Sequence, residues 1–510
     1  MLSVESRTQA HVVAGNTSRL RASATLSWRL LASATFASVL AGCAVGPDFK
    51  RPAAPAVSAY TTAPLPAQTA SSDTELGGAQ RFITGASVET SWWRKLGSPK
   101  LDALIEQAFL ASPTLSSAQA TLRQAQETYA AQAGSTRYPQ VDAGLGAQRQ
   151  RLNPAVQGLS GSAREFSLYS ANVGVHYQLD LAGGNRRALE ALAARAEYQR
   201  YQWEGARLTL AGNIVTTAVT EARLDAQIQA TRAIVKAQEE QLQLTRERVR
   251  LGHAAQDDEL ALQTQLEQTR AGLPSLVKQL AQARHLQAVL VGRAPAADDV
   301  PRFTLKDFTL PTDLPLILPS ELVRRRPDIQ AAEALLHVAN AEYGVAVAKL
   351  YPQLNLSASL GSQALSAGAL FGSGSAAWSV IGQLTQPLFN PGLPAEKRAA
   401  LAAFDAAAAN YQSVVLESLR NVADVLRALE SDAQTLAALA NADAASQASL
   451  ESMRRQYKLG SASYVQLLIA EQQLQQIRIS LIAAQAQRLV DSAALYQAMG
   501  GAWWKGQTTD

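Results

Sequence analysis

The chain has a single cysteine, Cys43, among its 510 residues. One thiol cannot form a disulfide within the chain, so a fold held by internal disulfides is excluded. Charged residues make up only 17% of the sequence, where about 25% is usual. Aromatic residues make up 6%. Long tracts of Ala, Leu, Gln and Arg take their place, and such tracts favour long helices that pack closely.

Residues that carry chemistry are also scarce. The histidines share no metal-ligand spacing, and three methionines are too few for a thioether ladder that binds soft metals. The GSGS stretch at 372–375 precedes neither a helix nor a lysine, which excludes a phosphate-binding loop. No grouping of serine, histidine and acid supports nucleophilic catalysis. We therefore expect no enzymatic activity, no metal and no cofactor.

The first 42 residues have the features of an export signal. Arg19, Arg21 and Arg29 precede the apolar run LLASATFASVLAGC, which is too short to span a bilayer as a helix. The last four letters, LAGC (40–43), resemble a bacterial lipobox, in which the cysteine becomes the lipidated first residue of the mature chain. We expect lipidation of Cys43, with an unmodified buried thiol as the alternative. Ala44 follows, where an aspartate would resemble the signal for retention in the inner membrane, so the expected location is the outer membrane.

Removal of the signal also removes most of the positive charge. Residues 1–42 contain four arginines and one glutamate, so the mature chain carries +4 − 3 = +1. This balance excludes a basic surface for nucleic acid. Residues 43–90 begin with a stretch rich in Pro and Ala, which predicts a lipidated, extended N-terminal segment between the anchor and the folded body.

The rest of the chain is an internal repeat. The triplet Tyr-Pro-Gln occurs at 138–140 and again at 351–353, and Leu251-Gly252 corresponds to Leu459-Gly460. The order of matching residues is preserved, so the chain is a tandem duplication of about 200 residues, much longer than solenoid repeats. We place the first copy at 91–300, the second at 301–500 and a C-terminal tail at 501–510.

Each copy contains two segments in which apolar and polar residues alternate, as in strands with two different faces. They lie at about 140–150 and 166–181 in the first copy, and at about 353–361 and 376–389 in the second. Their lengths suit strands that cross a membrane at a tilt. Four strands cannot close a barrel, and an open edge in lipid leaves backbone groups unpaired. Three copies of the chain would supply a twelve-stranded barrel.

Long helical hairpins account for most of the remaining sequence. No proline occurs from Asn185 to Gly252, and a continuous helix of that length would reach about 100 Å. Leucine, isoleucine and valine recur every seven residues on both sides of the glycine, at 228, 235, 242 and 249 and then at 266, 273 and 280. The pattern returns after Gly460, at 467, 474 and 481. This spacing predicts antiparallel hairpins that turn at Gly252 and Gly460. Ordinary core positions are the alternative for any single leucine.

Several motifs in this order resemble one known family. They are GPDFKRPAAP after the lipobox, SWWRKLGSPKLDALI (91–105), RRRPDIQAAEALL (324–336), Tyr-Pro-Gln twice and the two Leu-Gly turns. Together they are similar to the outer-membrane factor (TolC-like) family, in its NodT-like lipoprotein branch. The resemblance implies a mainly α fold with a membrane β-barrel portion. Three internally duplicated protomers would contribute four strands each to a trimeric twelve-stranded barrel, and their hairpins would form a periplasmic helical barrel.

The same resemblance implies a function and partners. Such a protein is the outer-membrane exit channel of a tripartite efflux system and conducts drugs or other toxic compounds passively. It works as a homotrimer with a periplasmic adaptor protein and an inner-membrane transporter, usually of the resistance-nodulation-division type. An exit channel for protein secretion is one alternative, and a structural lipoprotein that bridges the periplasm without conducting is another. The membrane-length strands argue against the structural alternative.

The resemblance also places a functional site at the hairpin turns. Leu251, Gly252, Leu459 and Gly460 would form the periplasmic tip that docks on the adaptor. Family members often carry an aspartate nine residues beyond the second glycine, where this chain has Ile469. With Val465 and Gln466 one turn nearer the tip, the expected constriction is apolar and amide rather than acidic, and an apolar ring can exclude water. A carboxylate ring of Asp257 or Asp258 is the alternative, and so is an ordinary solvated helix start for these two residues.

Overall fold

The computed structural model describes residues 44–86, 88–153, 158 and 160–501. Cys43, the expected signal at 1–42 and all but the first residue of the expected tail lie outside this part. The described residues form two compact units. The strand unit consists of residues 44–48, 131–190 and 341–401, and the helical unit of residues 49–130, 191–340 and 402–501.

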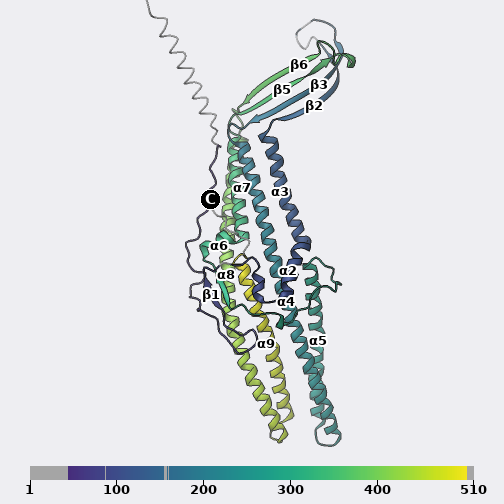
Figure 1. Cartoon of the computed structure of the whole chain (residues 1–510), viewed down its shortest axis with the longest axis vertical. Coiled ribbons are helices and arrows are strands. Elements are labelled where there is room, and N and C mark those ends of the chain that lie inside the picture. Colours follow the sequence, from purple (N-terminus) through teal and green to yellow (C-terminus); the bar gives the residue numbers. More distant parts are fainter. Residues whose placement is uncertain (1–43, 87, 154–157, 159, 502–510) are drawn as a thin grey trace, which may run out of the picture. The chain divides into compact units, whose positions relative to one another are not determined.

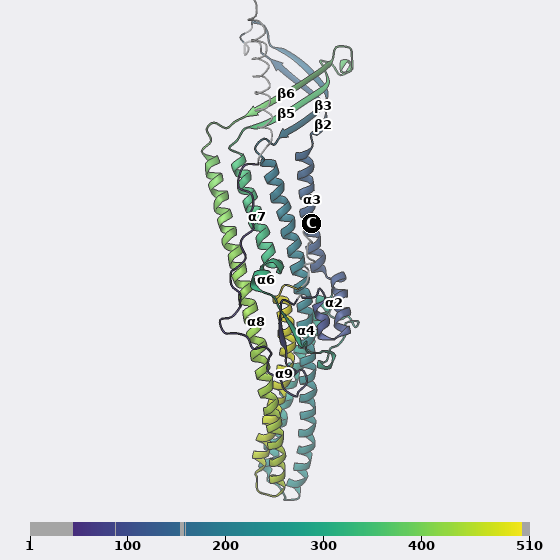
Figure 2. The same cartoon turned by 60° about the vertical axis from the view of Figure 1, so that its left-hand side comes forward.

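The two halves of the chain repeat one order of main elements, two helices, two strands, a long helix and a shorter helix, although the short β and η elements before them come in opposite orders and η4 occurs only in the second half (Figures 1 and 2). The first half runs β1 (Arg81–Thr84), η1 (Trp92–Leu96), α2 (Pro99–Ala111), α3 (Pro113–Arg137), β2 (Gln140–Leu152), β3 (Arg164–Leu179), α4 (Gly184–Arg250) and α5 (Gln256–Leu290). The second runs η3 (Leu305–Asp307), β4 (Asp313–Leu316), α6 (Pro319–Arg325), α7 (Pro327–Ala348), β5 (Gln353–Ala364), η4 (Ala367–Ala369), β6 (Ala376–Thr385), α8 (Gly392–Lys458) and α9 (Tyr464–Ala498). Helices α4 and α8 both have 67 residues, and α5 and α9 both have 35. The repeat in the sequence is therefore a repeat in structure.

The strand unit contains one antiparallel sheet in the order β2-β3-β5-β6. Residues that are cross-strand partners lie on the same face, and in the middle of the sheet the register gathers apolar residues on one face and small or polar residues on the other. One row joins Val141, Val175, Ala358 and Val380, and the next row on that face joins Ala143, Val173, Leu360 and Trp378. The opposite face carries Asp142, Gly174, Ser359 and Ser379. This is the alternation of apolar and polar residues expected from the sequence.

The apolar face of the sheet is exposed within one chain. Trp378 is 76% exposed, and Val380, Leu360 and Val141 are similarly open. The polar face, by contrast, borders a hollow of about 540 Å³ beside the end of α3, lined by Gln140, His176 and Asn355 among others. An apolar outer face and a polar inner face are the pattern of a strand that separates lipid from water.

Proline sets the limits of the strands. β2 begins directly after Pro139 and β5 directly after Pro352, so both Tyr-Pro-Gln triplets join a helix to a strand. Proline suits this junction because it cannot continue a helix and lacks a ladder donor. β6 ends at Thr385, four residues before the limit expected from the sequence, since Pro387 has no N–H for the ladder.

The main core of the helical unit lies where η1 and α2 pack near the end of α9. Trp92 in η1 is buried and stacks on Tyr496 with ring centroids 5.5 Å apart, while Trp93 meets Phe109 edge to face. The parallel pair of β1 and β4 lies in this unit too, with Arg81 opposite Asp313. The SWWRKL motif therefore serves to pack the start of the first copy against the end of the second.

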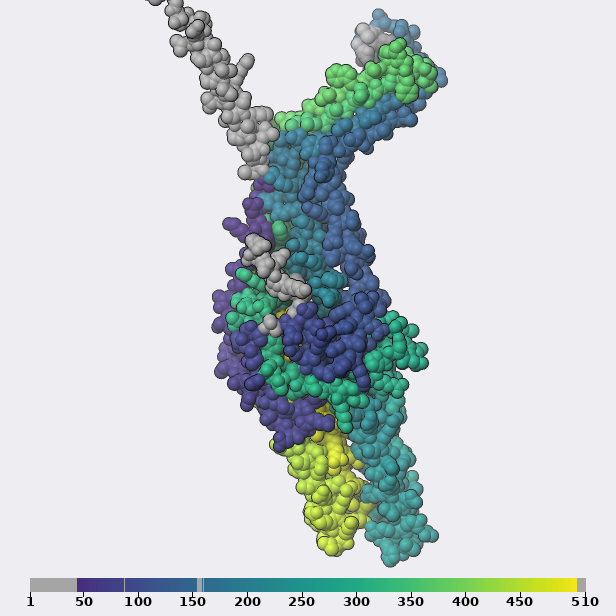
Figure 3. Space-filling view, in the orientation of Figure 1, coloured from purple at the N-terminus to yellow at the C-terminus, as the bar shows by residue number. Residues whose placement is uncertain are grey.

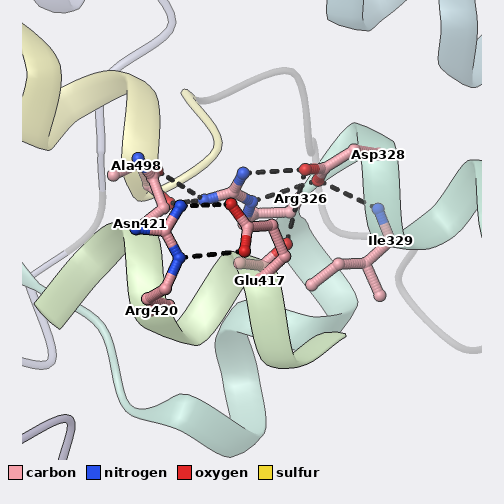
Figure 4. Close-up of polar contacts among 8 residues, drawn as sticks. Arg326, Asp328, Ile329, Glu417, Arg420, Asn421 and Ala498 are labelled. Carbon is pink, nitrogen blue, oxygen red and sulfur yellow. Dashed lines mark hydrogen bonds and ion pairs between the residues drawn. The ribbon is translucent and has the colours of Figure 1, made fainter. Parts of the chain in front are cut away.

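The RRRPD motif joins three helices of the helical unit (Figure 4). The Arg326 guanidinium donates to both carboxylate oxygens of Asp328, at 3.0 and 2.7 Å, and to Asn421 Oδ1 on α8. It also donates to the carbonyl of Ala498 at the end of α9, 2.9 Å away. A cation at a helix C-terminus is favourable because the last carbonyls lack intrahelical partners. This motif has a structural role in the chain.

Residues 49–86 are extended and bind the helical unit at several points, and Figure 3 shows part of this segment in purple on its surface. Tyr60 donates to the carbonyl of Ile317 at 2.6 Å, and Arg427 donates to the carbonyl of Ala63. Arg488 of α9 is fully buried and donates to the carbonyl of Leu76 and to Gln80 Oε1. The segment is therefore part of the folded unit and not a free linker.

Among the described residues, none of the helices combines the length and apolar character that crossing a membrane requires.

Candidate functional site at the hairpin tips

The turns at Gly252 and Gly460 have the same backbone geometry. Each glycine has φ of +76°. Gly252 N donates to Val249 O and His253 N to Arg248 O, while Gly460 N donates to Tyr457 O and Ser461 N to Gln456 O. This pair of bonds is the Schellman motif, which satisfies the last carbonyls of a helix and favours glycine at the left-handed position. The two turns that the sequence predicts to be equivalent therefore have the same backbone geometry in the structure.

The leucine before each glycine is exposed. Leu251 is 62% exposed and Leu459 is 83% exposed. A β-carbon added at either glycine would have no other heavy atom within 4 Å. The two turns therefore form open surfaces, each with one apolar side chain that the chain itself leaves uncovered.

The three aperture candidates on α9 differ in their surroundings. Val465 and Ile469 are 54% and 60% exposed and lie one turn apart, on the same side of the helix. Gln466 is also exposed, but its Oε1 accepts a hydrogen bond from the backbone N of Ser463 at 2.8 Å, and Ser463 Oγ accepts from Gln466 N. Gln466 therefore completes a capping box at the start of α9. The exposed stripe left beside it is apolar.

Asp257 and Asp258 lie in the first turn of α5, together with Glu259. Asp257 is exposed and Asp258 half-buried. Carboxylates are favourable at this position because the N–H groups of the first turn lack partners. Glu259 forms an ion pair with Arg246 of α4, with 2.9 Å between Oε1 and Nε.

Leucines at the predicted heptad positions pack the hairpins together near the tips. One cluster contains buried side chains from all four long helices: Leu242 (α4), Leu262 and Leu266 (α5), Leu450 (α8), and Tyr464, Leu467 and Leu474 (α9). Ile228 and Leu280 pack in a second cluster between α4 and α5. The predicted long helical hairpins are confirmed, and their ends share a core.

Two polar contacts between the hairpins were not predicted from the sequence. Arg248 of α4 donates to the hydroxyl of Tyr457 on α8 at 2.9 Å, and its guanidinium lies 5.5 Å from the centroid of that ring. Gln241 of α4 donates to the hydroxyl of Tyr464 on α9 at 3.0 Å. Burial raises the pKa of Tyr464 to about 12, so the hydroxyl stays protonated. These contacts hold the second hairpin to the first just above the turns.

The sequence offered one signal for these contacts. Tyr457 lies three residues before Gly460 and Tyr464 four residues after it, and aromatic residues are scarce in the chain. Their rings lie 5.4 Å apart between centroids. A pair of tyrosines around a turn could have marked the site.

Two further sequence predictions concern lipidation of Cys43 and the absence of a metal site. Cys43, the expected lipidation site, lies outside the described residues. In the described part of the chain, no three His, Cys, Asp or Glu side chains are grouped as a metal site would require.

Comparison with known proteins relates this chain to outer-membrane efflux proteins. A family model described as outer membrane efflux protein matches residues 104–292 and 318–501. The probable efflux pump outer membrane protein TtgC of Pseudomonas putida is 30% identical over 482 residues, which cover 93% of this chain and 96% of that protein. Outer membrane protein OprJ of Pseudomonas aeruginosa is 28% identical over 478 residues, with coverage of 92% and 95%.

A solved structure agrees with the sequence matches. The outer-membrane channel OprN superimposes with a TM-score of 0.81 at 28% identity and covers 90% of this chain and 100% of its own. The likeness confirms the predicted fold class, with two helical hairpins and four strands in a duplicated protomer. The matched segments cover well over half of the residues and include both hairpins and all four strands of the antiparallel sheet. The chain therefore belongs to the outer membrane efflux protein family, and it is an outer-membrane channel protein.

Proposed function

We propose that this protein is the exit channel of a tripartite efflux pump and that three copies close one barrel. The four-stranded sheet carries the proposal. Its apolar face is exposed, its polar face borders a hollow, and within the described chain β2 and β6 each have one unpaired edge. Unpaired edges are not tolerated in lipid, so further copies must supply the missing neighbours.

The partners and cargo follow from the relatives. TtgC is named for an efflux pump, and such a pump needs an inner-membrane transporter and a periplasmic adaptor to reach the outer membrane. The cargo is drugs or other small toxic compounds. The channel itself performs no catalysis, because it only conducts what the transporter delivers. A resistance-nodulation-division transporter is the type we propose.

The tips are the proposed docking site for the adaptor. Leu251 and Leu459 are exposed apolar side chains on turns that no described residue covers, and Gly252 and Gly460 hold those turns in shape. Exposed apolar side chains on a rigid turn are suited to contact with another protein. Three chains would present six such turns.

The proposed aperture is a ring of Val465 and Ile469 from three chains. Gln466, next to Val465 in the chain, is the third candidate for this ring, although its amide oxygen is engaged in the helix cap. An apolar constriction excludes water and ions until the hairpins move apart. Asp257 and Asp258 at the start of α5 are the second candidate for a ring at this end. Cys43 is the proposed site of lipidation.

Deletion of the gene, followed by a panel of toxic-compound susceptibilities, tests the proposal. We expect increased susceptibility to several chemically unrelated compounds, restored by the wild-type gene on a plasmid. Unchanged susceptibility with a loss of secreted proteins would indicate a secretion channel. Unchanged susceptibility and secretion, with altered envelope spacing, would indicate a structural lipoprotein.

A further inference from the structure

The first described residues of the mature chain are held in one position within the strand unit. Val45 N donates to the carbonyl of Ala182 at 3.0 Å, in the turn between β3 and α4. Ala44 lies against Gly183 in the same turn. A Pro- and Ala-rich segment directly after a lipidation signal has no need of such a fixed position if it serves only as a tether.

Arg187 provides most of the polar contacts to this segment. Its side chain is only 4% exposed. The guanidinium donates to the carbonyls of Val45 and Gly46, at 3.3 and 3.2 Å, and to Asp48 Oδ1 at 2.7 Å. The remaining partner is Glu190, one turn further along α4, at 2.7 Å. Three of the four partners therefore belong to residues 45–48, and without them a buried guanidinium would lose most of its hydrogen bonds.

Glycines leave the space that the segment occupies. A β-carbon added at Gly183 would lie 2.5 Å from the Cα of Ala44, and one added at Gly46 would lie 2.9 Å from the Cα of Gly344. A β-carbon at Gly344 would lie 2.9 Å from Cγ of Arg187. Such distances are shorter than van der Waals contact, so a larger residue at any of these positions requires the segment or Arg187 to move. We call Gly183, Arg187 and Gly344 the N-terminal clamp.

We infer that the N-terminal clamp is a binding site for residues 44–48 of the same chain, and that it fixes the lipid anchor beside the barrel during assembly. The inference rests on the proposed function, because lipidation of Cys43 and barrel closure come from it. Gly183 lies between the last residue of β3, Leu179, and the first of α4, Gly184. The clamp therefore lies at the end of the sheet from which the helices leave.

Covalent geometry connects the clamp to the anchor. Cys43 directly precedes Ala44 in the sequence, and Ala44 lies against Gly183 just after the end of β3, so a lipid on Cys43 would be attached one residue before a fixed position. The clamp thus replaces a loosely tethered lipid by one with a defined position, which lowers the conformational entropy lost when the strands insert.

Occupancy of the clamp can be read by crosslinking in the full-length protein in outer membranes. In a Val45→Cys, Ala182→Cys double variant, lipidation of the single native cysteine, as proposed above, leaves the engineered thiols as the only free ones. A short bis-maleimide should then link positions 45 and 182 within one chain. Arg187→Gln and Gly344→Ala should each lower this crosslink several-fold. The matched controls, Arg186→Gln on the exposed neighbour and Gly134→Ala at an open helical position of α3, should leave it unchanged.

A second variant separates anchor placement from a purely structural role. Four residues, Gly-Ser-Gly-Ser, inserted between Cys43 and Ala44 leave the clamp intact but allow the lipid to move by about 13 Å. We expect normal lipidation by mass, a normal crosslink, and several-fold less heat-resistant trimer in the membrane. Unchanged trimer with the insertion would overturn the inference, and so would an unchanged crosslink in the Arg187→Gln variant. Both readouts are independent of conduction, so a wild-type trimer without a pore would contradict the proposed function and leave the clamp result valid.

Discussion

Gly252 and Gly460 are single residues on which the shape of the tips depends. Both have φ of +76°, where any other residue is strained, although a β-carbon would meet no neighbour. We expect Gly252→Ala or Gly460→Ala to cost about 1 to 2 kcal/mol of free energy of unfolding through backbone strain alone. Thermal denaturation of the purified protein, followed by circular dichroism, measures the loss of Tm.

Gly272 is the matched control for these substitutions. It lies inside α5 with open space around it and a normal helical backbone. Gly272→Ala should raise the stability by about 0.5 to 1 kcal/mol, because alanine loses less conformational entropy in a helix. Equal effects of all three substitutions on Tm would show that the left-handed geometry is not what the two turns require.

Ile469 tests the apolar aperture. Ile469→Asp would place a carboxylate on the exposed stripe of α9, and three copies would repel one another and attract water. We expect a several-fold increase in closed-state ion conductance in planar bilayers. The double variant Asp257→Asn, Asp258→Asn is the comparison, and it should leave conductance unchanged. Unchanged conductance in Ile469→Asp, together with altered conductance in Asp257→Asn, Asp258→Asn, would place the constriction at the start of α5.

Asp491 gives the helical unit a dependence on pH. The side chain is buried on α9, and burial together with the nearby carboxyl of Asp432 raises its pKa from 3.8 to about 8. A hydrogen bond from Gln487 and the charge of Arg488 lower the pKa in turn, but the hydrogen bonds of Arg488 go to residues 69–80. The folded chain thus keeps a proton that the unfolded chain releases between these values, so stability falls as the pH rises from about 4 to about 8.

The prediction is therefore that the Tm of the wild type decreases between pH 5 and pH 9 more than that of Asp491→Asn, which cannot ionise at this position. Asp405→Asn, an exposed carboxyl on α8, should behave as the wild type does. An identical pH profile for all three proteins would mean that Asp491 loses its proton as readily in the folded chain as in the unfolded one.

At the scale of elements, the contacts between hairpins decide how easily the tips separate. The hydroxyls of Tyr457 and Tyr464 accept from Arg248 and Gln241 of α4. Each such bond contributes about 1 kcal/mol, so Tyr457→Phe with Tyr464→Phe should favour separation by about 30-fold, since every 1.4 kcal/mol is tenfold. We expect more frequent opening in single-channel records. Tyr351→Phe in the strand unit serves as the control, and opening at the wild-type frequency in the double variant would show that these bonds do not restrain the tips.

The same scale shows which features the sequence could predict. Hairpins and strands were predictable because periods of seven and two repeat over many residues, as at Leu242, Leu266 and Leu467, and each period reports one buried face. The C-terminal end of β6 and the cap at Gln466 depend on single residues, so periodicity gave no signal for them. Residues 44–86 have no period at all. Their binding depends on partners hundreds of residues away, such as Arg488, which no local pattern reveals.

The candidate site was predictable to the same extent. The turns were found because Leu-Gly occurs at equivalent places in two copies, and the structure gives both copies one geometry. The lipidation of Cys43 and the roles of the aperture residues stay predictions. So do the division of the chain at residues 91, 301 and 501 and the docking of the adaptor.

At the scale of the whole molecule, a single chain leaves surfaces that it cannot pair or cover by itself. Within the described residues, the four-stranded sheet has two unpaired edges and one exposed apolar face, and the hairpins carry exposed leucines at both turns. These surfaces are explained together if three chains surround one axis, because the edges then pair and the apolar faces meet lipid. The duplication supports this arrangement, since it makes each protomer approximately two copies of one building block.

Single-channel recording of the purified protein in planar bilayers, on particles whose mass has been measured in detergent, tests this account most directly. We predict that the protein part of each particle has the mass of three chains and that it produces discrete, uniform conductance steps. A monomeric particle, or a trimer that produces no steps under any voltage, would contradict the claim that this chain forms a water-filled channel.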